Sequence, residues 1–146
     1  MDAAPTLHLL DPASAPLLDR VADGVFDHAI DPARQAAFLA DGCHEMVIAV
    51  TGGQVVGMAS GTVLLHPDKP PAFFVAEVGV ACAWQGQGIG TALCRRLIAR
   101  ARGRGCKGIW LATEEENAAA RALYRRVGGR ETAGIVLFDW NGAMDG

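Results

Sequence analysis

The sequence predicts an α/β (α+β) fold in which helices flank a mixed, mostly antiparallel central sheet. Apolar runs of strand length follow one another between residues 45 and 80. Two segments between residues 88 and 127 carry apolar side chains at helical spacing, and glycine or proline separates the segments. Strands and helices in this order are typical of one sheet with helices on its faces. The chain has 146 residues and is expected to form a single domain, residues 1–146.

The first part of the chain is expected to form an edge strand at residues 6–10 and then two helices. The dipeptides Asp11-Pro12 and Asp31-Pro32 are helix-start signals, because aspartate caps the helix and proline fits its first turn. We expect the second helix to stop at Gly42. The apolar residues that continue the first signal at helical spacing are Leu17, Leu18, Val21 and Val25.

Three strands are expected next. Residues 45–50 and 54–65 are mainly apolar, and Thr51-Gly52-Gly53 between them is a hairpin-turn signal. Residues 66–71 contain three prolines, which fix φ and remove backbone donors, so a loop is expected there. Residues 73–80 are almost wholly apolar, which predicts a strand in the interior of the sheet.

The C-terminal part is expected to alternate helices and strands. Residues 88–102 place apolar side chains on one face and arginines mainly on the other, which predicts an amphipathic helix. Residues 107–113 predict a strand, and residues 117–127 predict an alanine-rich helix. Residues 135–140 predict a last strand, and the element order predicts parallel pairing near the middle of the sheet.

Charge and composition narrow the classes of partner. The net charge of −3 argues against nucleic acid and is compatible with a cationic substrate. No basic leader followed by an apolar segment occurs, nor an apolar run long enough to cross a bilayer, so no membrane partner and a cytoplasmic location are expected. The cysteines lack CxxC spacing, and His28, His44 and His66 share no ligand spacing, so no metal site is expected.

A glycine-dense turn joins the strand at residues 73–80 to the helix at residues 88–102. It reads Gln85-Gly86-Gln87-Gly88-Ile89-Gly90. Glycine lets backbone N–H groups approach a ligand closely, and the helix N-terminus adds unpaired N–H groups and the positive end of its dipole. Together these features predict a pocket for a pyrophosphate. A tight connection that binds no ligand is the alternative.

Two familiar phosphate loops do not fit this turn. If Gly86 and Gly88 were the first two glycines of a dinucleotide-binding fingerprint, the third glycine position would be Thr91. A Walker loop requires Gly-Lys-Ser/Thr, and the turn contains no lysine.

The turn resembles the Gln/Arg-x-x-Gly-x-Gly/Ala motif of the GNAT acetyltransferase superfamily. Residues 117–128 resemble the helix of the same family that reads Asn-x-x-Ala-x-x-Leu-Tyr-x-x-x-Gly, with Asn117, Ala120 and Tyr124 at matching positions. The two motifs occur in order, each on its expected element, and the resemblance runs from about residue 45 to the C-terminus. Gly129 departs from the pattern, since the family usually has an aromatic residue there, which affects packing more than chemistry.

The resemblance implies a fold whose central strands splay around acetyl-CoA, the co-substrate, without a metal. The strand backbone would pair with the pantetheine arm, and the loop amides would hold the pyrophosphate. Tyr124, the only tyrosine in the chain, would be the general acid toward the CoA sulfur, and a homodimer is compatible with the family. The cofactor-binding residues implied are Val78, Gly79, Val80, Gln85, Gly86, Gln87, Gly88, Ile89, Gly90, Thr91, Asn117, Ala120 and Tyr124.

Glu77 interrupts the apolar run at residues 73–80 and is the candidate general base. Strand alternation places it on a face with Phe73, Val75 and Gly79, where partial desolvation would favour proton abstraction. Many GNAT members carry an acidic residue in this region as the base, acting directly or through water. An ion pair with a nearby arginine is the alternative.

A narrower resemblance concerns the amine acceptor. Residues 26–28, 31–34, 66–71 and 77–80 are similar to those of the small aminoglycoside 3-N-acetyltransferase group. This similarity implies transfer to the 3-amino group of an aminoglycoside, an antibiotic-resistance activity. A protein N-terminus, a polyamine, or a CoA-binding regulatory module without turnover are the alternatives. The residues expected to bind the polycation are Asp27, His66, Asp68, Glu77, Glu114 and Asp139.

Overall fold

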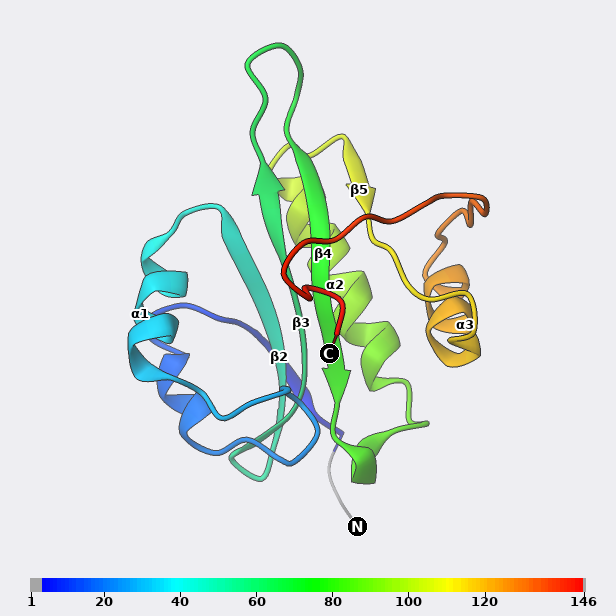
Figure 1. Ribbon diagram of the computed structural model, residues 1–146. Coiled ribbons are helices and arrows are strands. Elements are labelled where there is room, and N and C mark those ends of the chain that lie inside the picture. Colours follow the sequence, from blue (N-terminus) through cyan, green and yellow to red (C-terminus); the bar gives the residue numbers. More distant parts are fainter. Residues whose placement is uncertain (1–3, 146) are drawn as a thin grey trace.

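The computed structural model describes residues 4–145, so residues 1–3 and 146 of the expected domain lie outside the described part. Strands and helices occur in the mixed order expected from the sequence (Figure 1). The elements are β1 (Thr6–Leu9), the 3-10 helix η1 (Ala15–Asp19), α1 (Pro32–Ala40), β2 (His44–Thr51), β3 (Gln54–Leu64), β4 (Ala72–Val80), the 3-10 helix η2 (Cys82–Trp84), α2 (Ile89–Gly103), β5 (Gly108–Trp110) and α3 (Ala118–Arg126).

The five strands form one sheet in the order β1-β2-β3-β4-β5. Pairing is antiparallel from β1 to β4 and parallel between β4 and β5, which confirms a mixed, mostly antiparallel sheet with β4 inside it. The β2–β3 turn has positive φ at Gly52 and Gly53, as a two-residue hairpin requires. The parallel pair lies at the edge rather than near the middle, because the last predicted strand does not form.

Apolar side chains are buried on both faces of the sheet. Helix α2 covers one face with Leu93 and Leu97, which pack against Val47 and Phe73. The other face carries Ile48 and Met58 and is covered by η1, the segment after it and α1 (Figure 1). Among residues 4–145, no helix is long and apolar enough to cross a membrane.

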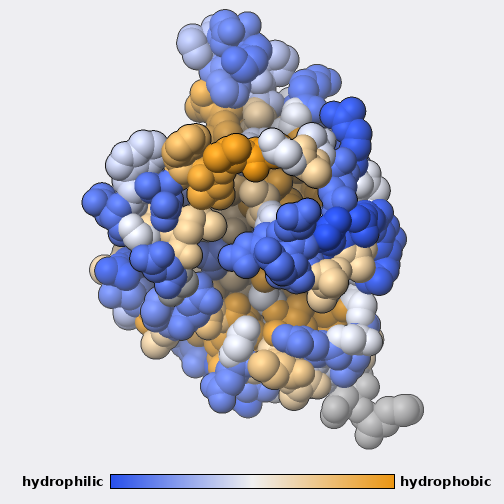
Figure 2. Space-filling model, turned by 45° about the vertical axis from the view of Figure 1, so that its right-hand side comes forward, coloured by the Kyte–Doolittle hydropathy of each residue, from blue (hydrophilic) through white to orange (hydrophobic). Residues whose placement is uncertain are grey.

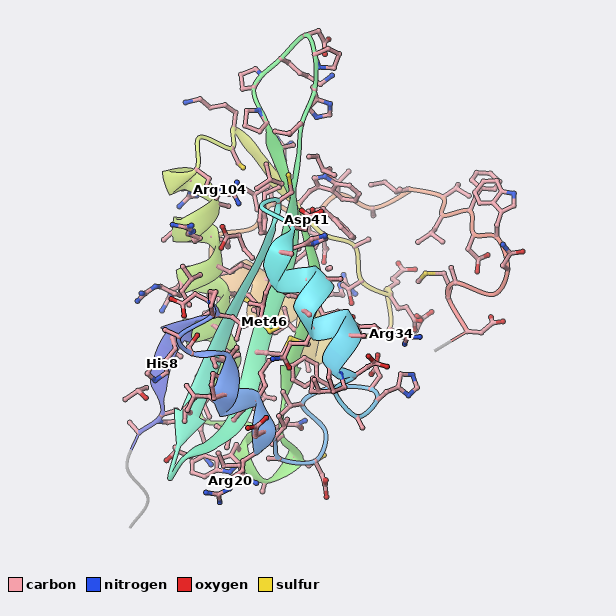
Figure 3. The ribbon with its side chains drawn as sticks, turned by 90° about the vertical axis from the view of Figure 1, so that its left-hand side faces the viewer. His8, Arg20, Arg34, Asp41, Met46 and Arg104 are labelled. Atoms are coloured by element: carbon pink, nitrogen blue, oxygen red, sulfur yellow. The ribbon has the colours of Figure 1, made fainter. Side chains whose placement is uncertain are left out.

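A buried carboxylate ties α2 to the sheet. Glu45 of β2 is 6% exposed and accepts hydrogen bonds from Arg100 Nε at 3.1 Å and Arg104 Nη1 at 2.9 Å. Figure 3 shows Arg104 at the end of α2 that is far from the glycine turn. Because a buried charge must be paired, this pair fixes the rotation of α2 against the sheet.

The prediction of a helix after Asp11-Pro12 is wrong over most of its length, because only η1 is helical there. The chain after Asp19 instead pairs with the start of β3: Val55 N–H donates to the Arg20 carbonyl, and Ala22 N–H donates to the Val55 carbonyl. Val21 and Val25 are therefore held by tertiary hydrogen bonds and packing, which override their helical spacing. The helix predicted after Asp31-Pro32 is confirmed as α1, and Asp31 Oδ1 caps it by accepting from two backbone N–H groups.

The predicted strand at residues 135–140 does not form. This segment belongs to a C-terminal arm, residues 132–145, which crosses in front of β5 and β4 in Figure 1 and extends away from the sheet in Figure 3. A strand needs a hydrogen-bonded neighbour, and at this distance from the sheet the arm has none in the described chain. Strand β5 is also shorter than residues 107–113, because its pairing with β4 ends at Trp110.

Candidate active site

Strands β4 and β5 separate after a short ladder. Their pairing runs from Ala72–Gly108 to Phe74–Trp110, whereas β4 continues to Val80. From Val75 onward the edge of β4 that faces β5 therefore has no paired strand in the described chain. Such an edge presents backbone N–H and C=O groups to a ligand. This opening agrees with the splay that the family resemblance implies, and Val78 and Gly79, which are half-buried, lie on the open part of β4.

A β-bulge in β4 decides which way Glu77 points. Ser60 pairs with Glu77 and Gly61 pairs with Val75, so Ala76 is an extra residue without a partner on β3. A bulge reverses the alternation of side chains beyond it. Glu77 consequently shares a face with Gly79 only. Phe73 and Val75 pack toward α2, so the expectation that they share the face of Glu77 is wrong.

Glu77 lies on the face of the sheet opposite α2. Its side chain is exposed, so the partial desolvation expected from the sequence is wrong. The ion pairs found in the described chain do not include Glu77, which leaves its carboxylate open to an incoming amine or to water. The geometry thus retains the accessibility that a general base needs.

The loop between β4 and α2 has the predicted glycine-dependent shape. Gly86 and Gly88 have φ of 77° and 81°, in the left-handed region, and Gly88 is the residue before α2. Gln85 Nε2 donates to the Val80 carbonyl at 3.2 Å and closes the loop onto the end of β4. The first backbone N–H groups of α2 therefore open toward the end of β4, as an anion site requires.

Two residues of the predicted cofactor set point into the protein. Ile89 packs in the core beneath the loop, and Thr91 is 7% exposed. The Thr91 hydroxyl accepts from Arg126 Nη1 of α3 at 3.3 Å, so it links the two helices. Ile89 and Thr91 can serve a bound pyrophosphate through their backbone N–H groups only.

Tyr124 of α3 lines an apolar cavity of about 490 Å³ between α2, α3 and the end of β5. Burial, together with the nearby Cys94, raises the pKa of the Tyr124 phenol. Burial also raises the pKa of the Cys94 thiol to about 11, so that thiol is a packed side chain rather than a nucleophile. Tyr124 thus stays protonated through neutral pH and can donate a proton.

The start of α3 is set by its own motif. Asn117 Oδ1 accepts from the Ala120 N–H at 3.0 Å and caps the helix. The Asn117 oxygen therefore has a structural role, while its amide NH₂ remains a potential donor to a ligand.

At the other end of α3, Gly129 N–H donates to the Tyr124 carbonyl, and a Cβ at Gly129 would come within 2.9 Å of that oxygen. This contact accounts for glycine where the family usually has an aromatic residue.

The segment between η1 and α1 lines a second, open cavity of about 710 Å³, whose lining includes three acidic residues. Asp27, predicted from the sequence, lines it together with Asp19 and Asp23, which the sequence reasoning missed. Asp19, Asp23 and Asp27 lie four residues apart, and this spacing could have identified them as one cluster. It equally fits one face of the helix that was predicted for this segment. A Cβ at Gly79 would collide with the Val25 carbonyl oxygen, so glycine allows this acidic segment to lie directly on β4.

The other predicted substrate residues are not gathered at one place. His66 and Asp68 lie in the β3–β4 connection, at the end of the sheet opposite the glycine turn (Figure 1). Glu114 is exposed ahead of α3, and Asp139 lies on the C-terminal arm, where its Oδ2 accepts from the Met144 N–H. Among residues 4–145, no group of three or more His, Cys, Asp or Glu side chains is arranged to hold a metal ion.

Comparison with known proteins identifies the family. The Acetyltransferase (GNAT) family profile matches residues 13–129. The chain is 42% identical over 101 residues to the N-alpha-acetyltransferase RimI of Mycobacterium tuberculosis, covering 67% of this chain and 61% of that protein, less than two thirds of its length. It is 31% identical over 144 residues to the aminoglycoside N(6')-acetyltransferase type 1 of Stenotrophomonas maltophilia, covering 93% of each chain.

Solved structures show the same fold. An aminoglycoside acetyltransferase from an uncultured soil metagenomic sample, in complex with trehalose, superposes with a TM-score of 0.80 at 19% identity, covering 94% of this chain and 95% of that one. The aminoglycoside acetyltransferase AAC(6')-Iy, in complex with a CoA bisubstrate analog, superposes with a TM-score of 0.74 at 15% identity, covering 95% and 99%. At such identities the likeness concerns the fold alone, which is the GNAT fold.

Substitution of Gly88 by alanine tests the loop geometry. An L-residue at φ 81° costs about 1–2 kcal/mol, so the loop should relax away from the shape that aims its amides at one point. We expect Gly88→Ala to weaken CoA binding roughly 5–30-fold in titration calorimetry. Gly90→Ala is the matched control, because its Cβ would make an ordinary 3.5 Å contact with Leu123. Equal affinity of both variants and the wild type would contradict the role of the loop.

Proposed function

The chain belongs to the GNAT acetyltransferase family, and from that premise we propose that it transfers acetyl from acetyl-CoA to an amino group of an aminoglycoside. GNAT acetyltransferases use acetyl-CoA, and relatives of this chain are named N-acetyltransferases. The observation that carries the choice of acceptor is a cavity lined by Asp19, Asp23 and Asp27. It lies in the same segment as Val25, whose carbonyl packs against Gly79 of β4, and Gly79 is two residues from Glu77.

The binding of acetyl-CoA is proposed to use backbone rather than charged side chains. The open edge of β4 at Val78, Gly79 and Val80 would pair with the pantetheine arm. The N–H groups of the loop from Gly86 to Gly90 would hold the pyrophosphate at the positive end of α2. This arrangement would bring the thioester into the opening between β4 and β5, within reach of both faces of β4.

The proposed chemistry is direct transfer. Glu77 takes a proton from the substrate ammonium, directly or through a water, because only the neutral amine can attack the thioester carbonyl. The Val80 N–H is proposed to stabilise the oxyanion that develops there. As the carbon–sulfur bond breaks, Tyr124 gives its proton to the departing sulfur, and its raised pKa keeps that proton available at neutral pH. The attacking nitrogen loses its second proton as it becomes the amide and so restores the phenol, while Glu77 releases the first proton to solvent.

The acceptor is proposed from charge complementarity. Three acidic residues, Asp19, Asp23 and Asp27, line one cavity, and their negative charges would attract a polycation with several ammonium groups. We take the 3-amino group as the position acetylated, from the sequence resemblance, whereas the Stenotrophomonas maltophilia relative is named for the 6' position. A protein N-terminus is the second candidate acceptor, favoured by 42% identity to RimI over 101 residues.

A thiol-release assay with a panel of amines tests this proposal. We expect aminoglycosides to release CoA well above background, and peptides with free N-termini or simple polyamines to release little. Nuclear magnetic resonance of the product then shows which amine carries the acetyl group, and modification at the 6' position would refute the 3-amino assignment. Release with peptides alone would favour the N-terminal acceptor, and CoA binding without any release would indicate a regulatory module.

Replacement of Tyr124 by phenylalanine tests the general acid. Loss of a positioned proton donor costs typically 10²–10⁴-fold, so kcat should fall by about that factor while CoA affinity in calorimetry stays unchanged. Because burial raises the pKa of Tyr124 above the usual tyrosine value of 10.0, the wild-type rate should not decline on the alkaline side until the pH exceeds that value. An unaltered kcat in Tyr124→Phe would remove the residue from the mechanism.

Replacement of Glu77 by glutamine tests the general base. The deficit should be greatest at lower pH, where more of the amine arrives protonated and needs a base, and should reach about 10²-fold in kcat/KM. Glu116→Gln is the control, since Glu116 is also an exposed carboxylate but precedes α3 and lies outside the proposed site. A deficit that does not vary with pH would argue against Glu77 as the base.

A further inference from the structure

Ser60 of β3 carries a buried hydroxyl that the described chain leaves without a partner. The residue is 6% exposed, and no group within residues 4–145 forms a hydrogen bond with its side-chain oxygen. A polar group taken out of water normally finds a hydrogen-bond partner, because leaving it unpaired costs free energy. Every fully enclosed side-chain oxygen or nitrogen of the described chain has a partner, so the Ser60 oxygen must still reach open space.

The β-bulge in β4 places Glu77 opposite this hydroxyl. Gly61 pairs with Val75, so an unbroken antiparallel register would put Ala76 opposite Ser60. The extra residue moves the register on by one, and Ser60 pairs with Glu77 instead. Side chains directly opposite each other in an antiparallel pair share a face, and their Cβ atoms lie about 4.5–5.5 Å apart. The bulge thus brings a hydroxyl and a carboxylate together on the face away from α2.

The other neighbours of Ser60 on this face are apolar. Met46, labelled in Figure 3, lies opposite it on β2, and Met58 precedes it by two residues on β3. Both methionines are buried in the cluster that η1 and α1 cover. Figure 2 shows hydrophobic surface gathered on the side of the molecule that carries the C-terminal arm, below the hydrophilic tip of the β3–β4 hairpin. Because Met46 and Met58 are closed off and Glu77 is exposed, the Ser60 oxygen reaches open space on the side of Glu77.

A water molecule fits between the two side chains. No hydrogen bond joins Ser60 to Glu77 in the described chain, so a bridging group can reach both. A bound water needs two to four polar partners, and the hydroxyl and the carboxylate supply two of them. The acceptor ammonium would supply the third. Gly79 packs against the Val25 carbonyl, so the pair lies beside the segment that is proposed to attract the acceptor.

We propose that Ser60 is a positioning residue whose hydroxyl holds the water through which Glu77 deprotonates the acceptor amine. The water accepts a hydrogen bond from the substrate ammonium, donates one hydrogen to the Glu77 carboxylate and donates the other to the Ser60 oxygen. As the water takes the ammonium proton, it passes its own proton to Glu77, and Ser60 neither gains nor loses one. The inference rests on the proposed function, in which Glu77 is the base.

Replacement of Ser60 by alanine tests this role. With the best acceptor from the thiol-release panel, we expect kcat/KM to fall about tenfold, as for the loss of one hydrogen bond to a charged group, while CoA affinity stays unchanged. The loss should be greatest at lower pH, where more of the amine arrives protonated. Thr62→Val is the matched control, because Thr62 lies on the same strand and face but pairs with Phe74 and donates to the Val63 carbonyl. Equal losses in both variants, or a loss in Ser60→Ala that does not vary with pH, would indicate packing alone and overturn the inference.

A double variant separates the inference from the proposed function. Once Glu77→Gln has removed the base, the held water has no proton acceptor, so adding Ser60→Ala should cost nothing further. Additive losses would overturn the role of Ser60, as would a wild-type rate in Ser60→Ala when Glu77→Gln is impaired. Either of these results leaves Glu77 as the base. A wild-type rate in Glu77→Gln would instead refute the base, and the inference with it.

A crystal structure of the full chain with CoA gives a result that needs no turnover. We expect an ordered water within about 2.5–3.0 Å of both Ser60 Oγ and a Glu77 carboxylate oxygen. The same water should be absent in Ser60→Ala and present in Thr62→Val. A Ser60 hydroxyl that binds a backbone carbonyl, with no water between it and Glu77, would overturn the inference whether or not an amine is acetylated.

Discussion

The site depends on where the hydrogen bonds between β4 and β5 stop. Parallel strands that stay paired leave no room between them, and here the ladder ends at Phe74 and Trp110 while β4 runs on to Val80. The resulting gap gives β4 a backbone edge within the fold that water or a ligand must satisfy. Every proposed step uses this gap: the cofactor enters it, Glu77 lies on one face of β4, and Tyr124 approaches from α3 on the other side.

Glycine serves two different purposes around that gap. At Gly86 and Gly88 it permits positive φ, which turns the chain so that the backbone N–H groups of α2 open toward the end of β4. At Gly79 it permits close approach, because any larger side chain would displace the segment that contains Val25. The first purpose concerns the cofactor, and the second brings the acidic cavity with Asp27 next to the strand that carries Glu77.

The acceptor side is assembled from tertiary contacts rather than from one motif. Arg20 and Ala22 hydrogen-bond to Val55 of β3, and this pairing takes the chain out of helix after Asp19. The three aspartates at four-residue intervals then line a cavity instead of one helix face. The arm at the C-terminus shows the same dependence, since residues 135–140 have a strand-like sequence but form no strand in the described chain.

The sequence by itself determined the elements whose signals are local. Asp31 caps α1, the glycines shape the loop before α2, and the spacing of Leu93 and Leu97 gives α2 its apolar face, because each depends on neighbours within a few residues. Only the tertiary structure decided the face of Glu77, since a bulge at Ala76 arises from the register with β3. It also decided that residues 135–140 form an arm and not a strand, because a strand exists only where another strand supplies its hydrogen bonds.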